Sequence, residues 1–335
     1  MSGANYVAHN IRLNAGGTWL AIESRGLYNS TMIARLLLRL FALLLTATSL
    51  AFAQDKGSLN SAHQPTLPNL DNPTIPAKVL FGRKKEPVPT AAQAVGSYAR
   101  GCMAGAVPLP VSGETWQVMR LSRNRNWGHP NMIEAITRIA GKAPAVGWRG
   151  LLVGDIAQTR GGPMRSGHAS HQTGLDADIW FVPMPEHKLS QVDREKMSAT
   201  NVVTDDGNDV RPEIWSHAYI GILKLTAEDP EVERVLVNPA IKKALCRDVK
   251  NERGWLSKIR PWYGHNDHFH VRIKCPSGDT ECKPQTPPSQ NDECGPELAW
   301  WFTDEARKPK VPPVRPPEIK LYDLPPPCRQ IVASP

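Results

Sequence analysis

Residues 166–181 read SGHASHQTGLDADIWF, and the rest of the sequence is best understood from this stretch. Two histidines, His168 and His171, lie three residues apart in it. Two aspartates, Asp176 and Asp178, lie two residues apart. Neutral imidazole and carboxylate groups together are the usual ligand set of zinc in proteins. The stretch is therefore a candidate for one half of a zinc site.

A second polar stretch, Trp262–Lys274 (WYGHNDHFHVRIK), is the candidate for the other half. It contains His265, His268 and His270, so the two stretches together hold five of the ten histidines in the chain. A lone histidine is more often a satisfied polar residue than a ligand, and we keep that interpretation for the other five. Histidines and aspartates concentrated in two glycine-punctuated stretches are instead typical of a site. The sequence thus predicts a zinc hydrolase centre assembled from two distant segments.

Strand periodicity selects the side chains that can share this site. In HFHVRIK, His268 and His270 are two residues apart and point to the same face of a strand. In DADIWF, Asp176 and Asp178 also share a face, while Ala177 and Ile179 take the opposite one. In HFHVRIK, Phe269 and Val271 point away from the histidines, toward a core. With the two polar faces side by side, His270 and Asp178 can reach one metal, and His171 can approach from the preceding loop. Three such ligands and a water form a catalytic zinc site, whereas a structural zinc has four protein ligands.

The remaining polar side chains then have roles beside the metal. We expect His268 to take a proton from the bound water or to hold the developing oxyanion. His265 and His168 are expected to assist, one binding the substrate carbonyl and the other orienting a ligand. Asp176 is a candidate to fix the imidazole of a ligand through a hydrogen bond.

The composition suits an acidic partner. The chain has 335 residues, 41% of them hydrophobic, with a net charge of +8 and a pI near 9.2. This length can bury one sizeable core or two small ones. A basic balance fits nucleic acid, a membrane surface or an anionic polymer such as a cell wall. The absence of an arginine-rich run argues against nucleic acid.

Residues 32–53 (MIARLLLRLFALLLTATSLAFA) have the pattern of a secretory signal peptide. Arg35 and Arg39 precede an apolar run, and residues 51–53 form a small-x-small cleavage pattern. An uncleaved anchor is the alternative, but the run is short for a stable membrane span, and no other apolar run approaches that length. We predict an upstream segment and signal peptide over 1–53, a Pro-rich flexible linker over 54–93, and one domain with a Pro-rich tail over 94–335.

All six cysteines lie in the exported part, which predicts three disulfides. Cys275 and Cys282 are close enough to staple one local loop, whereas spacing leaves the other pairs open.

Helical and strand patterns alternate without a βαβ rhythm, which favours the α+β class. The expected elements are strands at 116–121, 151–156, 176–182 and 268–274, helices at 131–140, 212–225 and 238–246, and a strand or short helix at 231–236.

The two polar stretches resemble the signature segments of penicillin-insensitive murein endopeptidases, in GHASHQTGLDADIWF and RPWYGHNDHFHVRIKCP. That family belongs to the lysostaphin-type and D-Ala-D-Ala metallopeptidase group, with its H-x6-D and H-x-H motifs. The similarity runs from about Gly96 to the end of the chain. It implies a small antiparallel sheet with flanking helices, as in the hedgehog-like and D-Ala-D-Ala zinc peptidases, stapled by disulfides.

The resemblance also implies the chemistry. Zinc would be held by His171, Asp178 and His270, with His168 in or beside the site, and a catalytic His268 would have His265 nearby. The reaction would be hydrolysis of D-alanyl-meso-diaminopimelyl cross-links of peptidoglycan in the periplasm. Because the nucleophile would be a metal-bound water and not a serine, penicillin should not acylate the enzyme. The implied disulfides are Cys102–Cys328, Cys246–Cys294 and Cys275–Cys282.

One part of the sequence departs from the family pattern. Relatives of this kind carry further Asp and His metal contacts between the two motifs. Here the segment SATNVVTDDGNDVRPE offers Asp205, Asp206 and Asp209 but no histidine in register. The sequence therefore assigns no second metal.

Other functions fit part of the pattern. A zinc D,D-carboxypeptidase or an L,D-endopeptidase would use the same metal site and differ only in the bond that it cleaves. A non-catalytic wall-binding or zinc-binding protein would bind without cleavage. An HNH-like nuclease, prompted by HNDHFH and the basic pI, would leave His171 and Asp178 without a role. The oligomeric state stays open, with a dimer among the outcomes.

Overall fold

The computed structural model describes residue 72, residues 74–308 and residues 317–335. The predicted signal peptide and the first part of the predicted linker therefore lie outside the described residues. Among the described residues, no helix has the length and apolar character that crossing a membrane requires.

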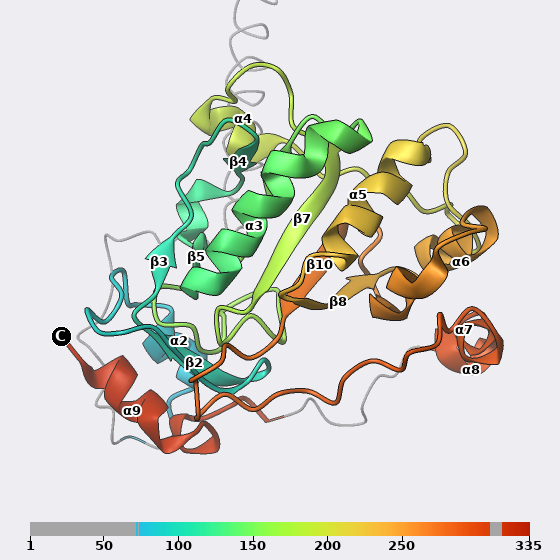
Figure 1. Ribbon diagram of the computed structural model, residues 1–335. Coiled ribbons are helices and arrows are strands. Elements are labelled where there is room, and N and C mark those ends of the chain that lie inside the picture. The colour runs from blue at the N-terminus through green and yellow to red at the C-terminus, as the bar shows by residue number, and fades with distance from the viewer. Residues whose placement is uncertain (1–71, 73, 309–316) are drawn as a thin grey trace, which may run out of the picture. The chain divides into compact units, whose positions relative to one another are not determined.

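A six-stranded mixed sheet forms the centre of the fold, in the order β4-β6-β7-β10-β8-β9 (Figure 1). The four middle strands pair antiparallel. The two outer strands pair parallel, β4 with β6 and β9 with β8. The strands span Trp116–Val118 (β4), Leu151–Val153 (β6), Asp176–Pro183 (β7), Val232–Val237 (β8), Ile259–Pro261 (β9) and His268–Ile273 (β10).

The parallel pairs correct the prediction of a small antiparallel sheet without βαβ units. A parallel connection requires a crossover, and a helix provides it in both cases. Helix α3 (Pro130–Lys142) lies between β4 and β6 in the sequence, and helix α6 (Pro239–Asp248) lies between β8 and β9. Strands β4 and β6 lie within the predicted strands 116–121 and 151–156, although each has only three residues. Strand β9 was not predicted, because its three residues are too few for the alternation that identifies a strand in a sequence. The α+β class is confirmed.

Local sequence signals explain where the helices begin. Helix α3 starts with Pro130, and the side chain of His129 accepts a hydrogen bond from the amide of Asn131 at 3.2 Å. Helix α6 also starts with a proline, after Asn238, whose side chain accepts from the amide of Ala240 at 2.9 Å. Proline at the first helical position loses no hydrogen bond, because that amide has no partner within the helix.

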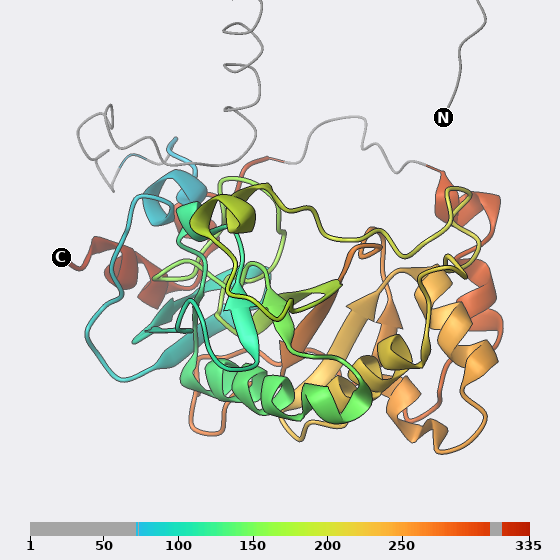
Figure 2. The same cartoon turned by 90° about the horizontal axis from the view of Figure 1, so that it is seen from above.

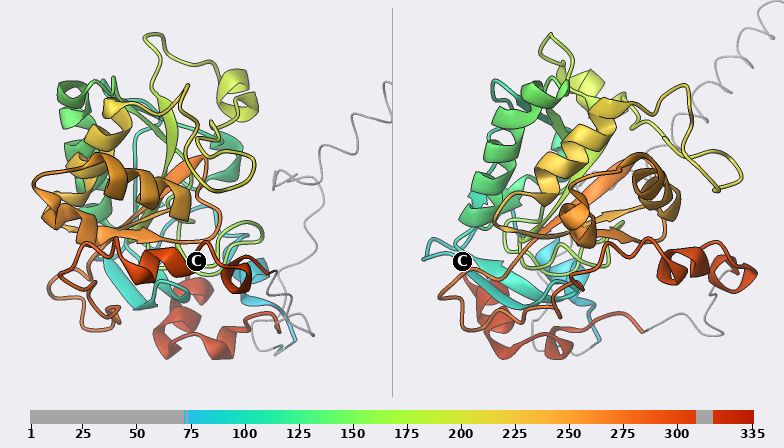
Figure 3. Two further views of the ribbon diagram at one scale, coloured as in Figure 1. Left: turned by 90° about the vertical axis from the view of Figure 1, so that its right-hand side faces the viewer. Right: turned by 45° about the vertical axis from the view of Figure 1, so that its right-hand side comes forward.

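Helix α5 (His217–Ala227) begins later than the predicted residue 212. Ser216 has an extended backbone (φ −145°, ψ 172°), which separates the helix from the turn that precedes it. Helices α3 and α5 cover one face of the sheet, in front of it in Figure 1 and to its left in the left-hand view of Figure 3.

The main core lies between these helices and the sheet. Ala177 and Ile179 of β7 and Phe269 and Val271 of β10 are at most 1% exposed and belong to one apolar cluster with α3 and α5 residues. These are the four residues that alternation predicts for the core face. The opposite face of β7 and β10 carries the histidines and aspartates, so the packing of the core fixes where those side chains point.

A smaller apolar cluster lies at one end of the sheet and joins the two ends of the described chain. Helix α2 (Ala77–Phe81), strands β1 (Gln93–Ser97) and β2 (Arg100–Ala104) and helix α9 (Pro326–Ala333) contribute to it. Leu80 is 5% exposed and Phe81 is fully buried. Helix α2 and the buried Val88 thus lie within residues 54–93, the stretch predicted as a linker.

Three disulfides staple the fold, and they are the pairs that the family resemblance implied: Cys102–Cys328, Cys246–Cys294 and Cys275–Cys282. The first ties helix α9 to strand β2 within the smaller cluster. The second ties helix α6 to the segment before helices α7 (Pro296–Trp300) and α8 (Asp304–Arg307), which Figure 2 shows at the opposite end of the sheet from α9.

The other elements are β3 (Val107–Pro108), β5 (Trp127–Gly128), α4 (Gln191–Lys196) and 3-10 turns at Leu121–Arg123, Ala143–Val146, Arg253–Lys258 and Leu321–Asp323.

Candidate metal centre

The pairing of β7 with β10 brings the two polar stretches together. In their antiparallel register, His270 lies directly opposite Asp178, and Arg272 lies opposite Asp176. His268 lies opposite Trp180 on the same face. Side chains that are directly opposite in such a pair have Cβ atoms about 5 Å apart. The sheet therefore places His270 and Asp178 at one point, as the strand argument expected.

His171 enters from the loop before β7 in a conformation that non-glycine residues rarely adopt. Its φ is +66°, and its backbone amide donates to Asp176 Oδ2 at 2.9 Å. Its side chain is fully buried. Backbone strain of this kind costs on the order of 1–3 kcal/mol and persists where the surroundings fix it. Asp176, the first residue of β7, thus holds the loop that carries His171 through its carboxylate.

Asp178 is surrounded by imidazole nitrogens. Its Oδ1 lies 3.4 Å from His171 Nε2 and 3.3 Å from His270 Nδ1. Its Oδ2 lies 3.3 Å from His168 Nδ1. His268 is slightly farther away, with Nε2 at 3.7 Å from Oδ1. Ligands of a tetrahedral zinc at 2.0–2.2 Å stand roughly 3.3–3.5 Å from one another, which matches the spacing of the three nearer nitrogens from the carboxylate.

The second nitrogen of each of these four rings is held by an oxygen atom. His171 Nδ1 lies 2.7 Å from the carbonyl of Ile156, and His270 Nε2 lies 2.8 Å from Asp176 Oδ1. The remaining two contacts are His168 Nε2 to Asp155 Oδ2 at 2.9 Å and His268 Nδ1 to Asp267 Oδ1 at 2.6 Å. A ring that donates one N–H to such an oxygen presents the lone pair of its other nitrogen, here toward Asp178.

Two buried atoms at the centre have no hydrogen-bond partner. They are His171 Nε2 and Asp178 Oδ1. Leaving a buried acceptor unsatisfied costs on the order of 1–3 kcal/mol, so such atoms need a physical explanation. A divalent cation bound by both atoms accounts for them. His168, His171 and Asp178 form the one group of three closely spaced ligand atoms found among the described residues, and His270 faces the same carboxylate.

The carboxylates of the centre are held ionised. Burial penalises their charge, but the imidazoles of His171, His168 and His268 outweigh it and keep the pKa of Asp178 well below its ordinary value. Asp176 is fully buried, and Arg272 and His270 likewise lower its pKa. An ionised carboxylate is the form that ligates a metal.

The histidines respond to these charges in opposite directions. Burial works against a charged His268, but Asp178 and Asp267 outweigh it and raise the pKa of His268. Burial, together with His268 and His270, lowers the pKa of His265 to about 4. His268 is thus the imidazole suited to carry a proton near neutral pH, and His265 the one suited to stay neutral.

The sequence of the whole domain decides the family. A family model described as penicillin-insensitive murein endopeptidase matches residues 94–333. The protein of that name from Haemophilus influenzae is 45% identical over 258 residues, 75% of this chain and 87% of the relative. The protein of that name from Salmonella paratyphi B is 43% identical over 73% of this chain. The one from Klebsiella pneumoniae is 42% identical over 74% of this chain, and each match covers 88% of the relative. The chain belongs to the penicillin-insensitive murein endopeptidase family.

In this family member the centre lies in a cleft of about 710 Å³. The five histidines of the two polar stretches line it, together with Arg234 and Arg260 from β8 and β9 and with Trp262 and Trp301 on its rim. His265 is the histidine farthest from the carboxylate cluster. Its φ is +54°, its Nδ1 lies 2.8 Å from the carbonyl of Tyr263, and its ring centroid lies 4.9 Å from that of His268.

Two charged residues of the centre, Asp155 and Arg272, were not assigned by sequence reasoning. Asp155 follows β6 and lies within 3.0 Å of both Arg123 and Arg125 as well as of His168. A single carboxylate in the apolar run LLVGDIA was its signal. Arg272 donates to Asp176 at 2.6 Å and shares the alternation of His268 and His270, which could have placed it.

The acidic segment between the motifs does not join this centre. The carboxylate of Asp206 accepts hydrogen bonds from Thr204 and Asn208 within its own loop. Asp209 pairs with Arg247, and Asp205 pairs with Arg211. In the described residues these three aspartates form no group with the spacing of metal ligands.

Proposed function

We propose that this protein is a periplasmic zinc D,D-endopeptidase that hydrolyses D-alanyl-meso-diaminopimelyl cross-links of peptidoglycan. The observation that carries the proposal is the pair of buried atoms without partners, His171 Nε2 and Asp178 Oδ1, at ligand spacing beside His270. Family membership supports the polymer as substrate, because the relatives carry the name murein endopeptidase. Within this proposal the fold is of the hedgehog and D-Ala-D-Ala zinc-peptidase type.

We assign the zinc to His171, Asp178 and His270, with His168 as a further contact. A zinc ion bound there would act as a Lewis acid and would lower the pKa of water, so that a nucleophile able to attack an amide exists near neutral pH. Asp176 holds His270 in the required ring orientation, and Asp155 does the same for His168. Substituting such supporting carboxylates typically costs 10–100-fold in metal affinity or activity.

His268 is the general base and then the general acid in this proposal. Asp267 fixes its ring through Nδ1, which leaves Nε2 facing the centre at 3.7 Å from Asp178. Its raised pKa suits a group that takes a proton and returns it to the leaving amine. His265, with its lowered pKa, stays neutral. Its Nδ1–H donates to the carbonyl of Tyr263, so its Nε2 can accept one hydrogen bond from an N–H of the substrate. No serine takes part, so penicillin has no residue to acylate at this centre.

The test is digestion of purified cross-linked sacculi by residues 54–335, read by mass spectrometry of the released muropeptides. The proposal predicts that cross-linked dimers become monomers and that penicillin does not prevent this. His171→Ala should abolish conversion, while His187→Ala, which removes an exposed histidine outside the cleft, should leave it intact. Loss of a terminal D-Ala with intact dimers would make the protein a carboxypeptidase. Binding without any cleavage would make it a wall-binding protein.

A further inference from the structure

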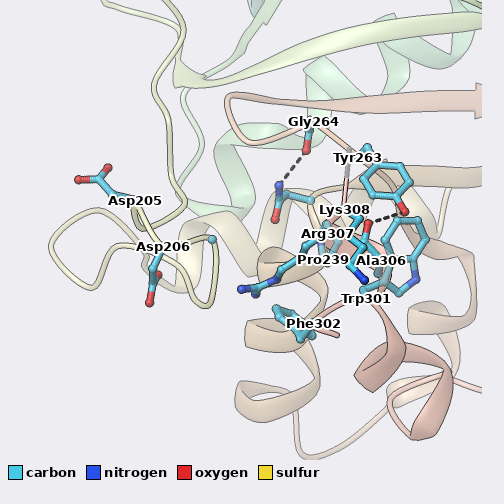
Figure 4. Close-up of a pocket in the computed structure, with 12 residues that line it drawn as sticks. Asp205, Asp206, Pro239, Tyr263, Gly264, Trp301, Phe302, Ala306, Arg307 and Lys308 are labelled. Atoms are coloured by element: carbon cyan, nitrogen blue, oxygen red, sulfur yellow. Dashed lines mark hydrogen bonds between the residues drawn. The ribbon is translucent and has the colours of Figure 1, made fainter. Parts of the chain in front are cut away.

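A second cavity, of about 530 Å³, lies beside the metal cleft and has no role in the mechanism above. Tyr263, Gly264 and Trp301 line both spaces, so the cavity continues from the rim of the cleft. Figure 4 shows Tyr263 and Trp301 side by side on one wall and the loop of Asp205 and Asp206 on the other side. We refer to this space as the rim pocket.

The rim pocket is built around aromatic rings that water can reach. Tyr263 is 44% exposed, and its neighbour Trp262, which lines the metal cleft but not the rim pocket, is 52% exposed. The ring centroids of Tyr263 and Trp301 are 4.8 Å apart in an edge-on arrangement, and those of Trp262 and Trp301 are 6.3 Å apart. In an edge-on pair the edge of one ring covers a single face of the other, so the remaining ring faces stay unstacked, and adjacent exposed rings beside a cleft are typical of a binding surface.

The charged groups around these rings have both signs. Asp205 and Asp206 contribute negative charge, and Arg307 and Lys308 contribute positive charge. A pocket for a charged ligand would gather one sign of charge. Mixed donors and acceptors beside flat apolar faces fit a neutral ring that carries hydroxyl or acetamido groups on its edge and C–H bonds on its face. A pyranose sugar has this chemistry.

The rim pocket is held in place before any ligand binds. The hydroxyl of Tyr263 donates to the carbonyl of Ala306 at 2.9 Å, and Arg307 lies over the ring of Phe302 at 5.5 Å (Figure 4). The disulfide Cys246–Cys294 anchors the segment that leads into α7, and Trp301 and Phe302 lie in the turn between α7 and α8. A preformed site loses less conformational entropy on binding than a mobile one.

We propose that the rim pocket binds a hexosamine ring of the glycan strand to which the cross-linked peptides are attached. The inference rests on the proposed function, because a peptidoglycan substrate carries peptide and sugar in one molecule. A peptide stem in the metal cleft continues into the sugar that bears it, just as the cleft continues into the rim pocket. The pocket therefore makes the enzyme prefer cross-links that still carry their glycan.

Two matched substrates test this inference. One is a cross-linked muropeptide dimer that carries its disaccharides, and the other is the same dimer after an amidase has removed the sugars. Wild type should cleave the glycosylated dimer with a kcat/KM roughly tenfold higher, since aromatic stacking contributes about that factor. In Trp301→Ala the ratio of the two kcat/KM values should fall toward one, and Trp301→Phe should restore part of it.

An exposed aromatic elsewhere supplies the matched control. Tyr322 is 57% exposed and lines neither cavity, so Tyr322→Ala should keep the wild-type ratio. Binding of peptide-free glycan strands, measured by calorimetry on the full exported chain, should weaken about tenfold in Trp301→Ala and not in Tyr322→Ala.

The outcomes separate this inference from the proposed function. Cleavage of neither dimer would overturn the proposed function. Equal cleavage of both dimers by wild type, with no binding of peptide-free glycan, would leave the endopeptidase in place and overturn the glycan site. An equal loss on both dimers in Trp301→Ala would mean that the pocket serves the peptide, which also contradicts the inference.

Discussion

His268 and His270 lie two residues apart, and the proposed function gives them different tasks because their nitrogens face different partners. His270 presents Nδ1 to Asp178 at 3.3 Å, whereas His268 stays at 3.7 Å and is held by Asp267. We predict that His268→Ala keeps the metal and loses roughly 10²–10⁴-fold in kcat, the usual contribution of a positioned acid or base. Metal content and steady-state rates, measured on the same sample, check this. A fully active His268→Ala would refute the assigned role.

Lys242 gives a second prediction at the residue scale, away from the metal. Its side chain is fully buried, and its Nζ donates to the carbonyls of Leu256 and Asp292 at 2.7 and 2.5 Å. Burial and Arg260 lower its pKa to about 7. Above pH 7 the amine of Lys242 is deprotonated in the folded chain but still protonated in the unfolded chain. The free energy of unfolding should therefore rise with pH, by about 2 kcal/mol between pH 7 and pH 9.

Denaturant titrations of wild type and Lys242→Met at the two pH values measure this effect. The variant lacks the amine, so its stability should lack that rise. A rise of equal size in both proteins would show that other groups cause it.

At the scale of elements, the position of His171 depends on how the loop before β7 packs. Gly161 has φ +61°, and a Cβ there would lie 2.0 Å from the carbonyl oxygen of Gln172, the residue after His171. Gly207 has a similar φ of +67°, but a Cβ there meets nothing within 4 Å. Both alanine variants therefore carry the same backbone strain, and only Gly161→Ala adds a steric clash.

We expect Gly161→Ala to lose roughly 1–3 kcal/mol more stability than Gly207→Ala, the usual cost of overpacking. Thermal unfolding of the two variants beside wild type measures the difference. Equal melting temperatures for the two variants would contradict the claim that this loop is rigidly packed.

The strands that carry the site were predictable because their side chains alternate. β7 and β10 each have at least six residues, enough for a polar and an apolar face to appear in the sequence. The short parallel strands β4, β6 and β9 were missed as sheet neighbours, since their pairing depends on crossovers by α3 and α6 rather than on any local pattern. Asp155 was missed for the same reason: only the tertiary fold brings the end of β6 to His168.

At the scale of the whole molecule, the disulfides hold segments that are far apart in the sequence. Cys102–Cys328 closes a loop with a sequence separation of 226, whereas Cys275–Cys282 closes one of 7. In the chain-entropy view, removing the first should cost roughly 5 kcal/mol and removing the second roughly 2 kcal/mol. Urea unfolding of the two double-alanine variants tests this order. A larger loss from the short loop would contradict it.

The central claim is that a metal held by His171, Asp178 and His270 is required for cleavage while the fold stands without it. The most direct measurement treats the purified exported chain with a chelator, then follows sacculus digestion, zinc content and circular dichroism on one sample. We predict complete loss of cleavage as zinc is removed, an unchanged spectrum, and recovery when one equivalent of zinc is restored. Undiminished cleavage by protein shown to contain no metal would contradict the claim.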